Sequence, residues 1–221
     1  MNPVIDYHAL APEIVLSVTI ILCLLVDLFI PDRPRLVPQL ASLGVLAAII
    51  PVLTLAVSGT DVSMFGGAFV VDNYALAFDG LFLVVAYITL LVSFDEIADG
   101  DYYGGEYYVL LLTSVLGMVM MASSRDLVSI FIALETISIP TFVLAGWRKH
   151  DTKSNEAAIK YFLIGVLSSA VMLYGMSLIF GFANGTKLSV ISEYSAGSPP
   201  ALFPVAIFLT IVGFAFKVSA V

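Results

Sequence analysis

The sequence has little of what a metalloprotein, a disulfide-linked domain or a nucleic-acid-binding protein needs. Its 221 residues include one cysteine, Cys23, and two histidines, His8 and His150, which lie in different polar segments. A single cysteine can form neither an internal disulfide nor a set of iron–sulfur ligands, and no glycine-rich loop of nucleotide-binding spacing is present. The formal net charge of −8 disfavours nucleic acid, whose phosphates require a basic surface. The sequence therefore predicts no cofactor or metal in this chain and no nucleic-acid partner.

Charged residues are also scarce, and long apolar segments take their place. Hydrophobic residues make up 60% of the chain and charged residues 12%, with a mean hydropathy of +1.05. These values are typical of a polytopic membrane protein, and a membrane-spanning helix needs about 20 apolar residues. We expect an all-α bundle of transmembrane helices, forming one domain over residues 1–221, from seven apolar segments: 10–30, 36–58, 73–94, 106–122, 127–147, 156–182 and 201–221.

Lysine and arginine are unevenly distributed among the short polar loops. The loops after the first and fifth segments hold Arg33, Arg35, Arg148, Lys149 and Lys153. The loop after the second segment has none, and those after the fourth and sixth have only Arg125 and Lys187. Because basic loops are retained in the cytoplasm, we expect the amino terminus outside. The acidic loop at 95–106, which has no basic residue, does not fit this pattern.

The fifth segment, LVSIFIALETISIPTFVLAGW, places a glutamate and a proline among apolar residues. An ionised group at the bilayer centre costs about 2.5–3.5 kcal/mol, so Glu135 is expected to face the bundle interior and to have a partner. Pro140 has no N–H, which leaves the carbonyl of Thr136 without its helical hydrogen bond, and Ser138 adds a hydroxyl to the same turn. We expect a polar pocket half-way through the membrane. The alternative is a neutral glutamate that only stabilises helix packing.

Two lysines are candidate partners of this glutamate. Lys217 is the other charged residue well inside an apolar segment, and we expect it to pair with Glu135 and to hold or release a proton. Its alternative is an extended side chain that reaches the membrane interface. Lys160 follows Ser154 and Asn155, both of which are helix-capping types. It could equally join the relay or reach the cytoplasmic headgroups.

Two further acids are interpreted as structural. Glu13 follows Pro12 at the start of the first segment, where a carboxylate suits the positive end of the helix dipole. Asp79 lies seven residues after Asp72, on the same helix face, and a paired or hydrated structural role is expected. The last segment stops soon after Lys217 without a cap or a loop. We therefore expect the chain to be the front part of a longer protein.

Successive pieces of the chain resemble, in order, subunit N of the proton-pumping NADH:quinone oxidoreductase, respiratory complex I. The most specific pieces are SRDLVSIFIALETISIPTFVLAGW, EAAIKYFLIGVLSSA and GFAFKVSAV. The resemblance implies an antiporter-like fold of about fourteen helices in two inverted repeats, each with a broken helix. The seventh span is one of the broken ones. About seven helices of that fold are expected in this chain.

The resemblance also implies a function. Glu135 matches the family's fifth-helix glutamate, Lys217 its seventh-helix lysine and Lys160 a sixth-helix lysine, and the glutamate adjusts the proton affinity of the lysine. It implies a proton-translocating subunit in a bacterial plasma membrane that contacts lipid and other membrane-arm subunits. FMN, iron–sulfur clusters and quinone would then belong to other subunits, so this chain acts in an enzyme without redox chemistry of its own. The acidic loop departs from the family, and the eighth- and twelfth-helix positions of the proton path are not in the sequence.

Three alternatives remain at the level of sequence. The chain could be a sister subunit, M or L, or an antiporter subunit, although LETISIPTFVLAGW favours subunit N. It could be a cation/proton antiporter that works alone. In the third alternative it is a structural spacer, in which Glu135 and Lys217 only hold helices together.

Overall fold

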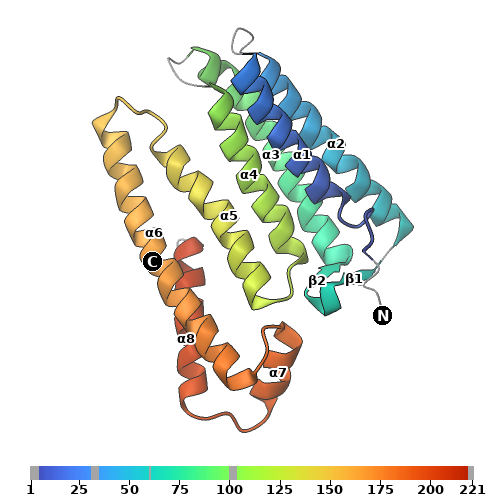
Figure 1. Ribbon diagram of the computed structural model, residues 1–221, viewed down its shortest axis with the longest axis vertical. Helices are drawn as coiled ribbons and strands as arrows, with labels where there is room; N and C mark the ends of the chain where they lie inside the picture. The colour runs from blue at the N-terminus through green and yellow to red at the C-terminus, as the bar shows by residue number, and fades with distance from the viewer. Residues whose placement is uncertain (1–4, 31–34, 60, 100–103, 219–221) are drawn as a thin grey trace.

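A computed structural model describes residues 5–30, 35–59, 61–99 and 104–218 of the chain. The described residues form eight α-helices and one short β-hairpin (Figure 1). The helices are α1 (Ala11–Phe29), α2 (Leu36–Ser58), α3 (Asn73–Asp99), α4 (Gly104–Ser123), α5 (Leu127–Ala145), α6 (Thr152–Ala183), α7 (Leu188–Ala196) and α8 (Leu202–Lys217). Arg33, positions 100–103 of the acidic loop and positions 219–221 of the seventh predicted segment lie outside the described residues.

The first six predicted membrane segments correspond to helices long and apolar enough to cross a membrane, α1 to α6. Their bounds agree with the prediction to within a few residues, and α2 covers the predicted range 36–58. The all-α class predicted from hydropathy is confirmed. Such segments are helical because intrahelical hydrogen bonds pair every backbone N–H and C=O where no water is present. The chain is an integral membrane protein.

The seventh predicted segment, 201–221, is shorter than expected. Within the described residues its helix, α8, has 16 residues, which corresponds to about 24 Å against about 30 Å for the hydrocarbon core. The end of α8 lies beside the middle of α6 (Figure 1), where Gly213 contacts Met172. The preceding polar segment, predicted as a loop, contains the nine-residue helix α7. Hydropathy averages over a window, so it shows neither this helix end nor this short helix.

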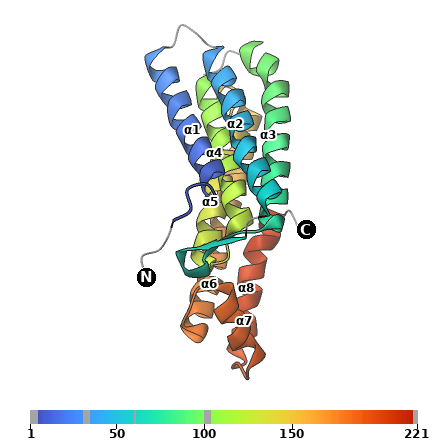
Figure 2. The ribbon, with the colours of Figure 1, turned by 90° about the vertical axis from the view of Figure 1, so that its right-hand side faces the viewer.

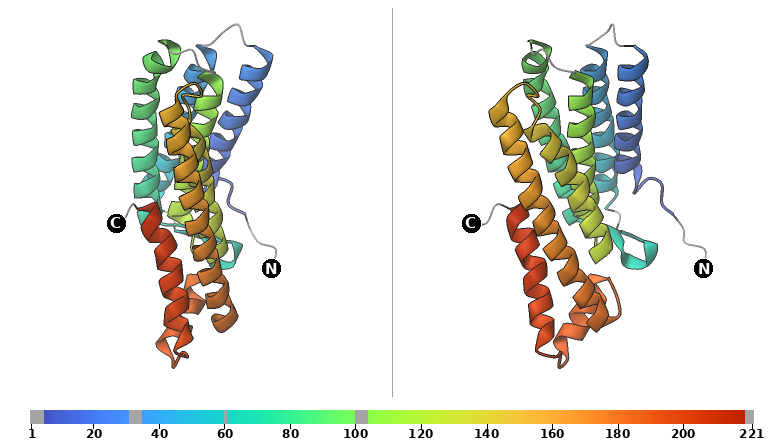
Figure 3. Two further views of the ribbon diagram at one scale, coloured as in Figure 1. Left: turned by 90° about the vertical axis from the view of Figure 1, so that its left-hand side faces the viewer. Right: turned by 60° about the vertical axis from the view of Figure 1, so that its left-hand side comes forward.

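The helices pack in two groups that are joined by α5. Helices α1 to α4 form a bundle, α5 packs against α4, and α6 packs against α8 and, less extensively, against α5. The right-hand view of Figure 3 shows α6 and α8 on one side of the molecule and α1 and α2 on the other. The α4–α5 contact is close at Gly117, where an added Cβ would lie 2.8 Å from the backbone nitrogen of Ile137. Small residues at such crossings let membrane helices approach one another.

A β-hairpin closes one end of the bundle (Figure 2). Strand β1 (Val62–Met64) pairs with the antiparallel strand β2 (Phe69–Val71) through a 3₁₀ turn, η1 (Phe65–Gly67). The turn requires positive φ at Gly66 (67°) and Gly67 (92°), a conformation that glycine adopts without steric cost.

Arg125, in the connection between α4 and α5, ties this hairpin to the helices. Its backbone N–H donates to the carbonyl of Ala68 at 2.8 Å, and its guanidinium lies 3.2 Å from a carboxylate oxygen of Asp72. Burial alone would raise the pKa of Asp72, but a hydrogen bond from the Ala75 N–H and the charge of Arg125 hold that pKa below its usual value. The ammonium of Lys187 donates to the carbonyl of Gly66, so the connection between α6 and α7 is held at the same end.

Candidate functional site

Helix α5 carries the glutamate predicted to be the centre of the site. Asp126 caps the helix, because its side chain accepts hydrogen bonds from the N–H groups of Val128 and Ser129 at 2.9 and 3.3 Å. Glu135 and Ser138 are three residues apart and therefore lie on one face of the helix. The helix continues through Pro140, which is buried. The proline removes one helical hydrogen bond without ending the helix.

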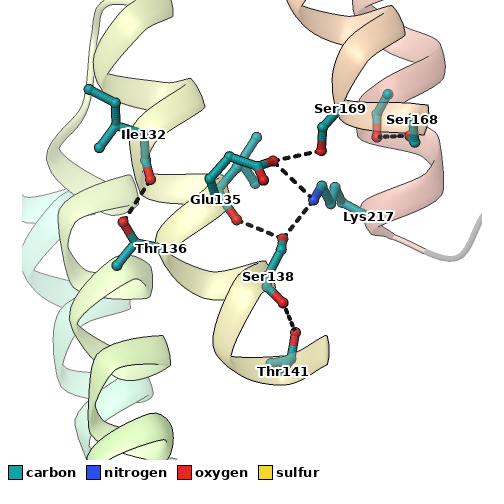
Figure 4. Close-up of polar contacts among 10 residues, drawn as sticks. Ile132, Glu135, Thr136, Ser138, Thr141, Ser168, Ser169 and Lys217 are labelled. Atoms are coloured by element: carbon teal, nitrogen blue, oxygen red, sulfur yellow. Dashed lines mark hydrogen bonds and ion pairs between the residues drawn. The ribbon is translucent and has the colours of Figure 1, made fainter. Parts of the chain in front are cut away.

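Lys217 meets this face from α8 (Figure 4). Its Nζ lies 3.3 Å from Oε1 of Glu135 and donates to Oγ of Ser138 at 2.6 Å. The hydroxyl of Ser138 in turn donates to the carbonyl of Leu134 at 2.6 Å. The side chain of Lys217 is 11% exposed and that of Glu135 is 21% exposed, so the lysine does not extend to the membrane interface. The pairing expected from sequence is present, 82 residues apart along the chain.

Two residues of the site were missed by the sequence analysis. Ser169, on α6, donates its hydroxyl to Oε1 of Glu135 at 2.6 Å (Figure 4). The ring of Phe142 lies 5.5 Å from the Nζ of Lys217, a cation–π contact. The Ser-Ser pair in the middle of an apolar segment was the available signal for Ser169. A phenylalanine in an apolar helix has no such signal, because most of them only fill space.

The last turn of α8 is positioned by close contact with α6. A Cβ at Gly213 would lie 2.3 Å from Cβ of Met172, and Oγ of Ser168 donates to the carbonyl of Gly213 at 3.4 Å. Gly213 is one turn before Lys217, so this contact sets how far the ammonium reaches toward α5. Ser169 follows Ser168 on α6, so the contact between α6 and α8 also positions the Ser169 hydroxyl beside Glu135.

Two of the predicted residues lie apart from this group. Thr136 donates its hydroxyl to the carbonyl of Ile132 at 2.8 Å and points away from Lys217 (Figure 4). Lys160 is 69% exposed and forms an ion pair with Glu156. It lies nine residues before Ser169 on the same helix, which corresponds to about 13 Å.

The arrangement suits proton binding. A carboxylate, an ammonium and two hydroxyls contact one another between α5, α6 and α8. Each of the four groups can donate or accept a proton or a hydrogen bond. Within the part of the chain that the structure describes, no group of three or more His, Cys, Asp or Glu side chains could hold a metal ion. A carboxylate–ammonium pair in a poorly solvated site changes its proton affinity strongly when the two groups separate.

Comparison with known proteins places the chain in a family. Residues 124–221, which include the site, match the transmembrane family described as NADH:quinone oxidoreductase/Mrp antiporter. The chain is 41% identical over 212 residues to NAD(P)H-quinone oxidoreductase subunit 2 of Synechococcus elongatus, covering 95% of this chain and 40% of that protein. It is 36% identical over 220 residues to NADH-quinone oxidoreductase subunit N of Trichlorobacter lovleyi, covering 98% of this chain and 45% of that protein.

Solved structures agree with these relatives. A chain of respiratory complex I from Thermus thermophilus superposes with a TM-score of 0.76 at 29% identity, over 93% of this chain and 43% of that one. A chain of an archaeal membrane-bound sulfane sulfur reductase has the same TM-score at 21% identity and shares the fold. The present chain thus spans less than half the length of these relatives. It has the fold of the antiporter-like membrane subunits, its residues 124–221 belong to the NADH:quinone oxidoreductase/Mrp antiporter transmembrane family, and it is similar to the oxidoreductase subunits called N and 2.

Proposed function

We propose that the chain is part of a proton-translocating membrane-arm subunit of NADH:quinone oxidoreductase, and that Glu135 and Lys217 form its proton relay. The observation that carries the proposal is the contact between the Lys217 ammonium, the Glu135 carboxylate and the Ser138 hydroxyl among membrane-spanning helices. An intramembrane ionisable residue with a defined partner is by default a functional-site hypothesis. Family membership supports it, because the relatives are named as subunits of this oxidoreductase.

The relay works through the separation of two charges. Opposite charges about 4 Å apart attract by roughly 4 kcal/mol at an effective dielectric constant near 20. When Glu135 approaches, Lys217 therefore holds its proton, and when Glu135 moves away, Lys217 releases it. A charge change elsewhere in the membrane arm, caused by quinone reduction, is the proposed trigger.

Lys160 enters the proposal as the member of the relay closer to the membrane surface. Its side chain is exposed and forms an ion pair with Glu156 in the first part of α6. The distance of about 13 Å along α6 to Ser169 is too long for direct transfer, so water must connect the two. The proton would then reach the carboxylate of Glu135 through Ser169, whose hydroxyl donates to that carboxylate.

The redox chemistry in this proposal belongs to other subunits, which hold FMN, iron–sulfur clusters and the quinone. A tagged full-length subunit, solubilised in mild detergent, is expected to co-purify with NADH:quinone oxidoreductase activity and with flavin. Recovery of the subunit alone, with neither flavin nor activity, while cation/proton exchange persists in vesicles, would favour an antiporter that works by itself.

The orientation of the chain in the membrane follows from its charges. Arg35, Arg148, Lys149 and Lys153 lie at the end of the bundle opposite the hairpin. At that end Arg148 pairs with Glu96 and Lys149 with Glu106. Two acids of the 95–106 loop, which has no basic residue of its own, are therefore paired with basic residues of the loop between α5 and α6. At the hairpin end Arg125 and Lys187 are both held by protein partners. We infer that the hairpin end and the amino terminus face outward.

Cysteine labelling tests this orientation. In a full-length protein with Cys23→Ser, a cysteine at Asp61 should react in intact cells with a thiol reagent that cannot cross the membrane. A cysteine at Lys153 should react only after the membrane is opened, because basic loops stay in the cytoplasm. Both positions are exposed, so a difference in labelling between them reports the side of the membrane and not the burial of the side chain. The reverse pattern would contradict the inferred orientation.

A further inference from the structure

The ring of Phe142 is a third contact of the Lys217 ammonium, beside Glu135 and Ser138. Phe142 is 4% exposed and lies on α5 seven residues after Glu135, which places the two side chains on the same helix face. The ammonium lies over the ring, with Nζ 5.5 Å from the ring centre. A cation within about 6 Å of an aromatic face is attracted by the negative charge density of that face.

Residues of α6 hold this ring in place. A Cβ at Gly165 would lie 2.3 Å from Cζ of Phe142, so the tip of the ring is pressed against the backbone of α6. The ring of Tyr161 packs against that of Phe142 in a T-shaped contact, with ring centres 4.7 Å apart and an interplanar angle of 90°. Tyr161 also lies 6.2 Å from the ring of Phe216, the residue before Lys217. The Phe142 ring therefore has little room to turn away from the ammonium.

The three contacts of Lys217 make different demands on the lysine. The Ser138 oxygen can accept a hydrogen bond from a charged ammonium or from a neutral amine. The Glu135 carboxylate attracts the ammonium strongly only while the two groups are close. The Phe142 ring attracts the lysine only while the lysine is charged, and this attraction does not require Glu135 to be near. The ring therefore distinguishes the protonated lysine from the deprotonated one.

We propose that Phe142 is a positioning residue of the relay, which keeps Lys217 at the site while the lysine is charged and frees its side chain once the proton has left. This inference rests on the proposed function of the Glu135–Lys217 pair. When Glu135 moves away, the charged lysine stays over the ring, so its proton leaves from a fixed place. The neutral amine that remains is no longer attracted by the ring. The position of Lys217 thus depends on its protonation.

Fluorination of the ring tests this proposal, because fluorine withdraws electron density from the aromatic face and nearly preserves the shape of the ring. Phenylalanine with one, two or three ring fluorines is incorporated in place of Phe142 in the full-length subunit of the assembled complex. Proton pumping is expected to fall with each fluorine, by roughly 2- to 30-fold in total, which corresponds to the loss of a cation–π attraction. A ring that only fills space would be little affected by the series.

Phe162 is the matched control position for the fluorinated series. Its ring lies 5.9 Å from that of Phe142, in the same aromatic group, and its side chain is half exposed. The same fluorinated residues at position 162 should leave pumping unchanged. Pumping is normalised to the amount of assembled complex, because a fluorine at the tip of the Phe142 ring also lies closer to Gly165. Phe142→Leu, which is apolar but has no aromatic face, should lower pumping at least as much as three fluorines.

The proposal is overturned if pumping per assembled complex is unchanged with three fluorines at position 142, or if the series at position 162 lowers it equally. Glu135→Gln, measured in parallel, separates this inference from the proposed relay. If Glu135→Gln loses pumping and the fluorinated Phe142 proteins do not, the relay stands and only the role of Phe142 is wrong. If Glu135→Gln pumps normally, the relay fails and the role of Phe142 fails with it.

Discussion

NADH-driven proton pumping is expected to fall sharply when Glu135 is replaced by glutamine in the full-length subunit, because losing a proton-transferring group typically costs roughly 10²–10⁴-fold in rate. Glutamine keeps the size of the side chain and can still accept the hydrogen bond from Ser169. It cannot carry the charge that holds the Lys217 ammonium at 3.3 Å. Assembly of the complex should therefore be largely preserved, while Lys217 loses the partner that adjusts its proton affinity.

Lys217→Ala should resemble Glu135→Gln, and the double variant should cost little more than either single one. Residues that act as one unit are not additive, because either substitution already removes the interaction. The measurement is the rate of vesicle acidification for the four proteins, normalised to the amount of assembled complex. Glu193→Gln, the same chemical change at an exposed position of α7, should pump normally. Losses that multiply in the double variant would show that the two residues act independently.

Gly213→Ala should lower both the stability of the assembled subunit and its pumping, although it changes no charge. The added Cβ would lie 2.3 Å from Cβ of Met172 and 3.1 Å from the carbonyl of Ser168, so α8 must move away from α6. Overpacking of this kind typically costs about 1–3 kcal/mol. Because Lys217 is one turn further along α8, the same movement displaces the ammonium from Glu135.

Gly181→Ala is the matched control for this substitution. Gly181 lies on α6, the helix that Gly213 of α8 contacts, but an added Cβ there meets nothing within 4 Å. Replacing glycine by alanine inside a helix at such a position is expected to stabilise it, by roughly 0.5–1 kcal/mol. Thermal inactivation of the solubilised complex, together with pumping in vesicles, measures both effects. If Gly213→Ala behaves like Gly181→Ala, the α6–α8 contact does not position Lys217.

The membrane helices and the ion pair at the site could be predicted from sequence for the same physical reason. A charge inside an apolar segment is costly, so Glu135 and Lys217 each needed a partner, and each was the best partner for the other. Hydropathy predicted the bounds of α1 to α6 to within a few residues, because a membrane span must be long enough to cross the hydrocarbon core.

What sequence could not provide depends on contacts between helices. A serine in a membrane helix can donate to the carbonyl four residues earlier, as Ser138 does with Leu134, so the Ser-Ser pair that contains Ser169 did not by itself indicate a contact with Glu135. Thr136 uses the same kind of bond and turns away from the site, although it is the direct neighbour of Glu135. Asp79 was expected to have a paired or hydrated structural role, but it is buried and its Oδ1 has no hydrogen-bond partner among the described residues.

The number of protons pumped per NADH oxidised, measured in inverted vesicles with equal amounts of assembled complex, tests the central claim most directly. The account predicts that Glu135→Gln lowers this number relative to the wild-type protein, and that Glu135→Asp, which remains ionisable, retains a good part of it. An unchanged number of protons per NADH in a normally assembled Glu135→Gln complex would contradict the account. In that case the carboxylate would serve only to hold α5 against α6 and α8.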